Sequence, residues 1–428
     1  MMNVSAFLPL VLVGVLGSFL PTATPTPSEI VICHGESTPE FTTWAPTNTN
    51  FAVSPIDLDP TKTYSMPLLA ETTKGELMLS WTEKDASGMT SFCVAFSKDK
   101  GKTFSEKKTI FSGNGIGNSR MMRAKVLSKK DGSFIAVFSN RGEAGAAPAS
   151  GRGGGRSSNI VYCISKDGGN TWTAPQSVDS DPKQGIVRGF FDAVILPNDE
   201  IAVAYLKDVA NSTKHEERDL RLVVSKDGVM QPERLLDAVV CDCCPINLSV
   251  DASGAFTVVY RDNNDDIRDM ARLISTDNAT TFSKSAIVYN DNWKIMGCPH
   301  SGAISAQYGK SELLAWFSGS DQEKGIRLTT REGKKFFVLT DASAKNPALT
   351  SGANSAVMLW EQSKGEGTPT QLAYRKIAEG QVSETTWIAD ATNATNATGI
   401  MLGNQLVVAY EAKQADGKNS LKFSYVSL

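Results

Sequence analysis

A cluster of cysteines is the part of the chain with the most distinctive chemistry. The run Cys241-Asp242-Cys243-Cys244-Pro245 holds three of the seven cysteines, and Gly297-Cys298-Pro299-His300 follows later. Thiolates and an imidazole suit copper or zinc, although a Cys-x-Cys-Cys run lacks the usual spacing of structural zinc sites. Four interpretations stay open: a disulfide from Cys298 to the cluster, a redox-active thiol pair, inert packing, and a copper or zinc site. The last would use Cys241, Cys243, Cys244, Cys298 and His300.

A second group of residues combines arginines with carboxylates near strand ends. Clustered guanidinium groups and an exposed tryptophan fit a pocket for an anionic ligand or a sugar. A solvated rim of surface ion pairs is the alternative. We predict ligand-binding roles for Arg123, Arg188, Arg261, Arg268, Asp269 and an exposed Trp293. Asp262 and Asp192 are the predicted proton donors, because cleavage of a glycosidic bond needs a positioned general acid.

An eight-residue pattern recurs along the chain and marks equivalent positions of a repeated unit. The pattern Ser-x-Asp-x-Gly-x-Thr-aromatic occurs at residues 97–104 and 165–172, and again at 275–282 with Ala279 in place of the glycine. The Asp carboxylate can accept backbone N–H groups within a tight turn, and the glycine permits a positive φ. The aromatic side chain is then free to pack between sheets. We interpret the octets as turns that brace a repeated unit.

Short apolar strands alternate with Gly, Asn and Asp turns from about residue 60 onward, and no segment has the periodicity of an amphipathic helix. Units of roughly 50 residues with three or four strands each are typical of a β-propeller. Seven very apolar second strands favour seven blades in one all-β domain. We expect residues 41–53 to complete the last blade, so the predicted propeller covers residues 41–428.

Propeller topology places the predicted site on one face of the ring. The starts of first strands and the ends of second strands share that face, whereas the octets lie on the opposite one. Met66-Pro67, Cys244-Pro245, Cys298-Pro299 and Asn346-Pro347 align at the same position of their units. The cysteines and arginines should therefore meet around the mouth of the central channel.

The octets resemble the Asp-box, or BNR, repeat of the sialidase (neuraminidase) superfamily. The segment from Tyr64 to Leu69, followed by residues 75–80, also resembles the Arg-Ile-Pro strand that leads into Gly-x-Leu-Leu-Ala in that family. The resemblance implies a β-propeller, six-bladed in most members, and an exo-glycosidase activity. The arginine that grips the substrate carboxylate in sialidases falls on Ser65, which cannot bind a carboxylate bidentately.

The remaining sequence features indicate where the protein is located and which kinds of partner it has. Residues 6–20 form an apolar run typical of a secretory signal, so we predict a signal peptide at 1–23, a disordered leader at 24–40, and export to the periplasm, cell surface or medium. The formal net charge of −3 argues against nucleic acid as a partner. The expected partner is a glycan or another small anionic ligand, with an exported or envelope protein as a further candidate.

Two functions are therefore predicted from the sequence. The first is an exported sialidase-like propeller that binds, and could hydrolyse, a glycan or other anionic ligand at the channel mouth. The alternative is a non-catalytic interaction or metal-binding propeller centred on the cysteine cluster, because the propeller fold supports many unrelated functions.

Overall fold

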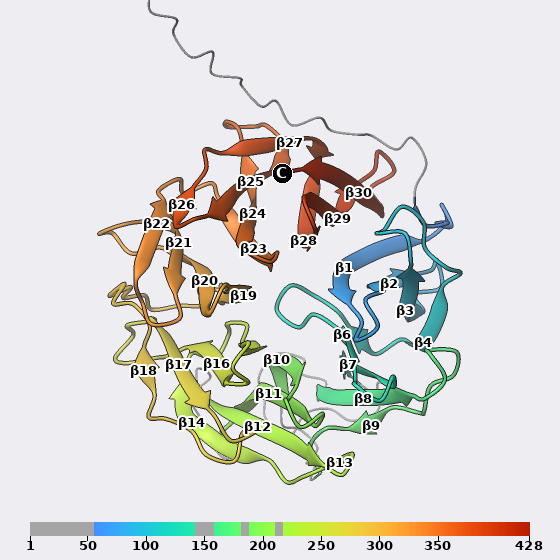
Figure 1. Cartoon of the computed structure of the whole chain (residues 1–428), viewed down its shortest axis with the longest axis horizontal. Coiled ribbons are helices and arrows are strands. Elements are labelled where there is room, and N and C mark those ends of the chain that lie inside the picture. Colours follow the sequence, from blue (N-terminus) through green and yellow to red (C-terminus); the bar gives the residue numbers. More distant parts are fainter. Residues whose placement is uncertain (1–54, 142–157, 181–187, 210–216) are drawn as a thin grey trace, which may run out of the picture. The chain divides into compact units, whose positions relative to one another are not determined.

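The computed structural model describes residues 55–141, 158–180, 188–209 and 217–428, which belong to the second of two units, Pro46–Leu428. Within these ranges every regular element is a β-strand, and the strands form seven sheets arranged in a ring (Figure 1). The predicted seven-bladed all-β propeller is confirmed, and the six-bladed alternative is wrong. The predicted signal peptide, leader and residues 41–53 lie outside the described residues. No helix in the described ranges could cross a membrane.

The blades follow one another along the chain. Blade one contains β1 (Thr63–Glu71), β2 (Leu77–Lys84), β3 (Thr90–Ser97) and β4 (Lys108–Gly113); blade two contains β5 (Ile116–Gly117), β6 (Lys125–Ser128), β7 (Phe134–Asn140), β8 (Asn159–Ser165) and β9 (Gln176–Ser177). Blade three contains β10 (Arg188–Ile195), β11 (Ile201–Asp208), β12 (Arg218–Lys226), β13 (Val229–Met230) and β14 (Arg234–Val240); blade four contains β15 (Asn247–Val250), β16 (Phe256–Arg261), β17 (Met270–Ser275) and β18 (Ala286–Ile287).

The last three blades complete the ring. Blade five contains β19 (Ile304–Tyr308), β20 (Ser311–Ser318), β21 (Gly325–Thr330) and β22 (Lys335–Leu339); blade six contains β23 (Lys345–Ser351), β24 (Ser355–Ser363), β25 (Thr370–Ala378), β26 (Gln381–Val382) and β27 (Thr386–Thr392); blade seven contains β28 (Ala394–Leu402), β29 (Gln405–Lys413) and β30 (Asn419–Ser427).

The hydrophobic core is divided into clusters that each lie between two neighbouring blades. The second strands are apolar along most of their length because both faces of each sheet are covered by the adjacent sheets. Trp81, Trp316 and Trp360, near the ends of these strands, are fully buried. Leu79 and Trp81 of blade one share a cluster with residues of blade seven, so packing closes the ring between β1 and β29.

A bulge recurs near the start of the first strand and directs side chains toward the centre of the ring. The pairing with the second strand shifts register after Ser65, Gly189, Lys345 and Thr395. The next residue in each case has a positive φ, between 53° and 56°. A bulge bends its strand and re-aims the following side chains. The repeated bulge therefore fixes which residues reach the channel.

The three predicted octets form the expected turns after the third strands β3, β8 and β17. In the turn after β8, Asp167 accepts the backbone N–H of Thr171 at 2.9 Å and its hydroxyl at 2.7 Å. Asp277 accepts the same two groups of Thr281 at 2.9 and 2.7 Å. The indole of Trp172 donates to the Gly169 carbonyl at 3.1 Å. The octets are thus structural turns, as predicted.

We expect these turns to lose stability in acid. The hydroxyl and backbone bonds from Thr171 and Thr281 lower the pKa of Asp167 and Asp277 to about 2. Unfolded aspartate titrates near ~3.9, so the stabilisation is complete above about pH 4 and is lost as the pH falls toward about 2. The variant D167N/D277N should show a flatter fall of the urea midpoint across this window than the parent or the exposed control variant D57N. Equal slopes in all three proteins would refute the assignment.

Candidate functional site

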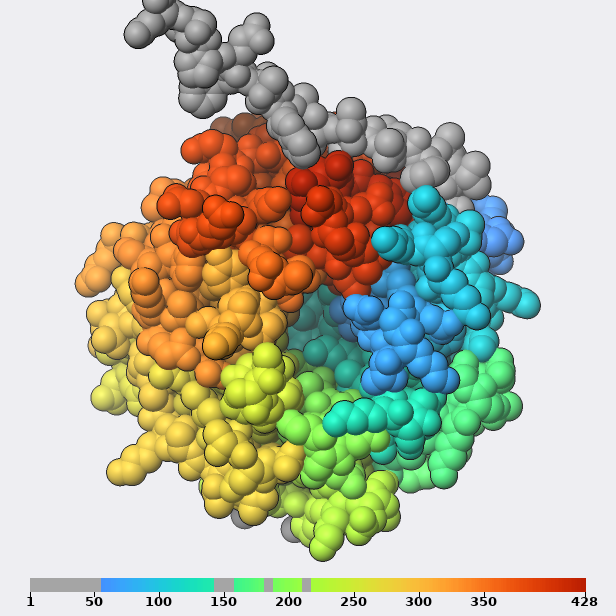
Figure 2. All heavy atoms as spheres, viewed as in Figure 1, coloured from blue at the N-terminus to red at the C-terminus, as the bar shows by residue number. Residues whose placement is uncertain are grey.

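The centre of the ring is hollowed on the face shown in Figure 2, and a cavity of about 220 Å³ lies at this position. Every blade contributes residues from the start of its first strand or from the segment before it. The lining includes Leu68, Arg120, Arg123, Lys125, Asp192, Asn247, His300, Ala303, Asn346, Ala348, Glu361, Asn396 and Ala397. The predicted geometry of the mouth is therefore present, and it brings together three of the predicted site residues: Arg123, Asp192 and His300.

One wall of the cavity is a hydrogen-bonded network centred on Glu361. Its carboxylate accepts Arg120 Nη2 at 3.0 and 3.2 Å, Asn346 Nδ2 at 2.9 Å and the backbone N–H of Asn396 at 2.7 Å. Arg120 Nε also donates to Asn396 Oδ1 at 2.9 Å. Burial raises the pKa of Glu361, and the charge of Arg120 only partly offsets this effect. The network joins blades two, six and seven.

Arg123 stands beside this network without a carboxylate partner of its own. Within the described ranges its single hydrogen bond runs from Nη2 to the carbonyl oxygen of Asn396, at 3.1 Å. Burial lowers the pKa of Arg123 to about 10, and the nearby charge of Arg120 acts in the same direction. The other guanidinium donors of Arg123 remain available on the cavity wall.

Asp192 and Lys125 occupy another part of the wall and form an ion pair. Asp192 also accepts the backbone N–H groups of Ala193 and Leu248, each at 2.8 Å. These contacts tie blade three to blades two and four, which is a structural role for the carboxylate. Its catalytic role stays a prediction.

The other predicted proton donor, Asp262, follows β16 and does not line the cavity. Its carboxylate accepts the backbone N–H of Asn263 and the side-chain amide of Asn264, each at 2.8 Å. Burial raises the pKa of Asp262 despite these bonds. Asp262 is not among the residues that line the cavity, so the structure does not place this predicted proton donor at the cavity.

Three predicted ligand-binding arginines are buried in the protein and do not line the cavity. Arg188 is 1% exposed and pairs with Asp179 at 2.7 Å. Arg261 is 1% exposed, and it donates to the carbonyl oxygen of Ser301 at 2.8 and 2.9 Å. Arg268, also 1% exposed, lies beside the cysteine cluster, where burial would lower its pKa but the sulfur of Cys241 and nearby carboxylates raise it.

The expectation that Trp293 is exposed is wrong. Its side chain is 9% exposed and packs on Phe317 with ring centroids 6.1 Å apart, while the Arg261 guanidinium lies 5.0 Å from its ring. Asp269 accepts the backbone N–H groups of Asn292 at 3.0 Å and of Trp293 at 3.1 Å. Both predicted ligand-binding residues therefore hold the segment between blades four and five in place.

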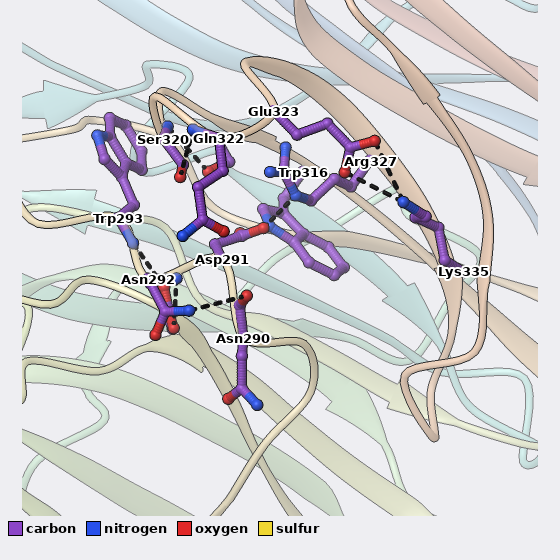
Figure 3. A network of polar contacts seen from close by, with 12 residues as sticks. Asn290, Asp291, Asn292, Trp293, Trp316, Ser320, Gln322, Glu323, Arg327 and Lys335 are labelled. Carbon is purple, nitrogen blue, oxygen red and sulfur yellow. Dashed lines mark hydrogen bonds and ion pairs between the residues drawn. The ribbon is translucent and has the colours of Figure 1, made fainter.

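The same segment contains a buried ion pair that the sequence did not identify. Asp291 and Arg327 are in contact and are 0% and 1% exposed, and the Trp316 indole donates to Asp291 at 2.7 Å (Figure 3). Burial raises the pKa of Asp291 even with these partners present. This pair joins the end of blade four to strands β20 and β21 of blade five.

The cysteine cluster lies between β14 and β15, where its three sulfurs are close together. The sulfur of Cys241 lies 3.5 Å from that of Cys244 and 3.9 Å from that of Cys243. The ligand atoms of Cys243, Cys298 and His300 form a second group within 4.8 Å of one another. All six cysteines in the described ranges are free thiols, so the structure does not contain the predicted disulfide of Cys298.

The sequence did not indicate site roles for Arg120, Lys125, Asn346, Glu361 and Asn396, although the aligned repeats placed Asn346 near the channel mouth. A signal was present, since Glu361 and Glu411 both follow an aromatic residue at the end of a second strand, and Asn346 and Asn396 both occupy the positive-φ position of the bulge. Asn is among the residues that adopt this conformation most readily. The partners across the channel could not be paired from the sequence, because they come from three different blades.

Comparisons with known proteins support the fold. No protein-family model matches the chain, and a search of curated proteins found no match. A protein of unknown function from Dyadobacter fermentans DSM 18053 is 13% identical with a TM-score of 0.51, and the match covers 86% of this chain and 96% of that one. A PL25 ulvan lyase, a polysaccharide lyase bound to -[GlcA(1-4)Rha3S]-, is 10% identical with a TM-score of 0.53, covering 86% and 94%.

Sialidases are also among the similar structures. Trypanosoma rangeli sialidase is 13% identical with a TM-score of 0.48, and the match covers 86% of this chain but only 55% of the sialidase. The β-propeller architecture that the resemblance of the octets implied is present in the seven sheets of the ring. Ser65, at the position of the sialidase arginine, bonds the hydroxyl of Thr82 at 2.9 Å and does not line the cavity.

Proposed function

We propose that this propeller binds an anionic glycan, with a carboxylate or sulfate group of the sugar seated against Arg123 in the central cavity. The observation that carries the proposal is a half-buried guanidinium on the cavity wall that has no ion-pair partner within the described ranges, although Arg120 and Lys125 beside it are paired. Arginine binds carboxylate and sulfate-like oxygens through two parallel N–H bonds. A ligand anion would supply the missing counter-charge.

The size and chemistry of the cavity are consistent with a single charged sugar residue. Pro347, Ala348 and Ala397 offer apolar surface, while Asn247, Asn346 and His300 offer polar groups that could contact hydroxyls. A mixed lining with a few placed polar groups is typical of small-ligand sites. The lyase of similar fold binds an oligosaccharide that carries carboxylate and sulfate groups, which agrees with this choice of ligand class.

Export belongs to the same proposal, because glycans of this kind are found outside the cytoplasm. It is supported by the apolar run at residues 6–20 and by the residues that follow it. The mass of the mature protein and its N-terminal peptide, recovered from the natural host, would test it. A chain that keeps Met1 in the cytoplasmic fraction would refute export.

Binding is tested by titrating the protein calorimetrically with oligosaccharides that end in a uronate, a sulfated sugar, sialic acid or a neutral sugar. We expect at least one anionic series to bind and the neutral series to fail. The variant R123A should weaken binding about 10- to 100-fold, since it removes a charge-assisted pair of hydrogen bonds, while R123K should weaken it less.

The matched control is K166A, which removes a positive charge from the octet turn of blade two on the opposite face. Its affinity for the glycan should equal that of the parent. Products from any of these glycans in the same samples would extend the proposal from binding to catalysis. If no anionic glycan binds, or if K166A and R123A weaken binding equally, the assignment of Arg123 is refuted.

A further inference from the structure

The spacing of the three buried sulfurs of the cysteine cluster matches that of ligands around a metal ion. A disulfide needs sulfurs about 2.05 Å apart, which is much shorter than the 3.5 and 3.9 Å found from Cys241 to Cys244 and Cys243. Two thiolates that bind one ion tetrahedrally at about 2.3 Å lie about 3.8 Å apart. The three side chains are between 1% and 4% exposed, so water does not compete for this position.

A second set of ligands adjoins the first and shares one sulfur with it. Cys298 and His300, both exposed, place their ligand atoms within 4.8 Å of each other and of Cys243. Cys298 also lies 4.0 Å from the carboxylate of Asp242. Because Cys243 belongs to both sets, its thiolate is positioned to bridge two metal ions. Cys241, Cys243 and Cys244 belong to the loop before blade four, whereas Cys298 and His300 belong to the loop before blade five.

A buried positive charge that is only partly compensated lies beside the sulfurs. Arg268 is 1% exposed, and its Nε and Nη1 atoms have no hydrogen-bond acceptor in the part of the chain that the structure describes. Its third nitrogen, Nη2, reaches Asp266 at 3.4 Å. The backbone N–H of Cys241 also bonds the carbonyl oxygen of buried Arg261, at 3.1 Å. Two buried guanidinium nitrogens without an acceptor are costly, whereas a negatively charged thiolate–metal centre would bring further negative charge next to them.

We propose that Cys241, Cys243, Cys244, Cys298 and His300 form a thiolate-rich centre for two copper(I) ions, with the Cys243 sulfur as the bridge. Thiolate ligands select soft ions such as copper(I), and three sulfurs without a fourth ligand suit copper(I) better than tetrahedral zinc. Each coordinating thiol loses its proton to solvent when the ion binds, and the oxidation state of copper does not change. The centre lies next to the central cavity because His300 lines both.

The test uses the full chain, reduced and stripped of metal under anaerobic conditions, and titrates it with copper(I) held by bicinchoninate. We expect the protein to remove two copper ions per chain, with sulfur as the dominant neighbour in X-ray absorption spectra. The variant C298S/H300A should bind one copper ion, because it removes the exposed set alone. The variant C243S should weaken binding more than about 10-fold, because both sets lose their shared ligand.

The matched control is C163A, which removes a buried free thiol from β8 outside the cluster and should still bind two ions. Thermal midpoints show whether each variant is folded. Copper left entirely with bicinchoninate would overturn the proposal, and so would a Cys298 disulfide that survives in the protein isolated from its host. Retention of zinc with no copper would overturn the choice of metal. Glycan binding is measured separately, so the failure of one proposal does not imply failure of the other.

Discussion

Replacing Asp291 by alanine is expected to lower the free energy of unfolding by about 3–5 kcal/mol, among the largest effects of any single substitution in this protein. Asp291 and Arg327 are 0% and 1% exposed, so the variant leaves a buried guanidinium without its counter-charge. It also removes the acceptor of the Trp316 indole, at 2.7 Å. The fall should appear as a lower urea midpoint, with the signal of Trp316 changing in the same transition.

The second half of this prediction concerns the double variant D291A/R327M. Burial raises the pKa of Asp291, although the Trp316 hydrogen bond and the charge of Arg327 both favour its ionised form. Buried pairs of this kind can often be replaced by apolar side chains at little cost, because both desolvation penalties disappear together. The double variant should therefore recover much of the stability that D291A loses. Equal or greater destabilisation in the double variant would contradict this interpretation.

Replacing Glu361 by alanine should disrupt the channel mouth and cost about 2–4 kcal/mol of stability. Glu361 accepts hydrogen bonds from Arg120, Asn346 and the backbone of Asn396. Its loss leaves the Asn346 amide and the Asn396 N–H without an acceptor, and it removes the counter-charge of Arg120. The expected cost is smaller than for Asp291, because the Arg120 side chain is 33% exposed and water can replace the lost partner. E361A should also lose glycan affinity, since Arg120 would be free to move toward Arg123.

The pH dependence of stability separates the charge of Glu361 from its hydrogen bonds. Its pKa is raised in the folded protein, so the contribution of this group is greatest below the unfolded pKa of about 4.3 and declines as the pH rises through the folded pKa. The E361Q variant keeps the shape and one acceptor oxygen but cannot ionise. The stability of the parent relative to E361Q should therefore fall as the pH rises above about 4.3. A difference that stays constant with pH would show that burial does not govern this carboxyl group.

The repeated local features could be predicted from the sequence because each is decided within a few residues. An octet such as that of Asp167 forms its turn with Thr171 four positions away, and the hydrogen bonds are the expected ones. The second strands, such as the one that contains Trp360, consist mostly of apolar residues. This composition by itself predicts that both of their faces are buried. Seven such strands and the octets were sufficient for the propeller and for the face on which its mouth lies.

The assignments of individual charged residues failed where burial depends on neighbouring blades. Arg261 and Trp293 were both predicted to bind ligand, but they pack on each other between blades four and five. Arg188 forms an ion pair with Asp179, and Asp269 accepts the backbone N–H of Asn292. The sequence shows which charged residues each strand carries. It does not show which oppositely charged residue of another element lies closest to each of them.

The sequence by itself determined the all-β repeat, the blade count, the position of the octets and the grouping of the cysteines at one end of adjacent blades. These follow from local turn chemistry and from the burial of whole strands. Only the tertiary structure decided which arginines are buried, that Glu361 links three blades, and that Arg123 remains unpaired on the cavity wall. Those properties arise because the ring places residues such as Arg120 and Asn396 in contact across 276 positions of the chain, so no local pattern can report them.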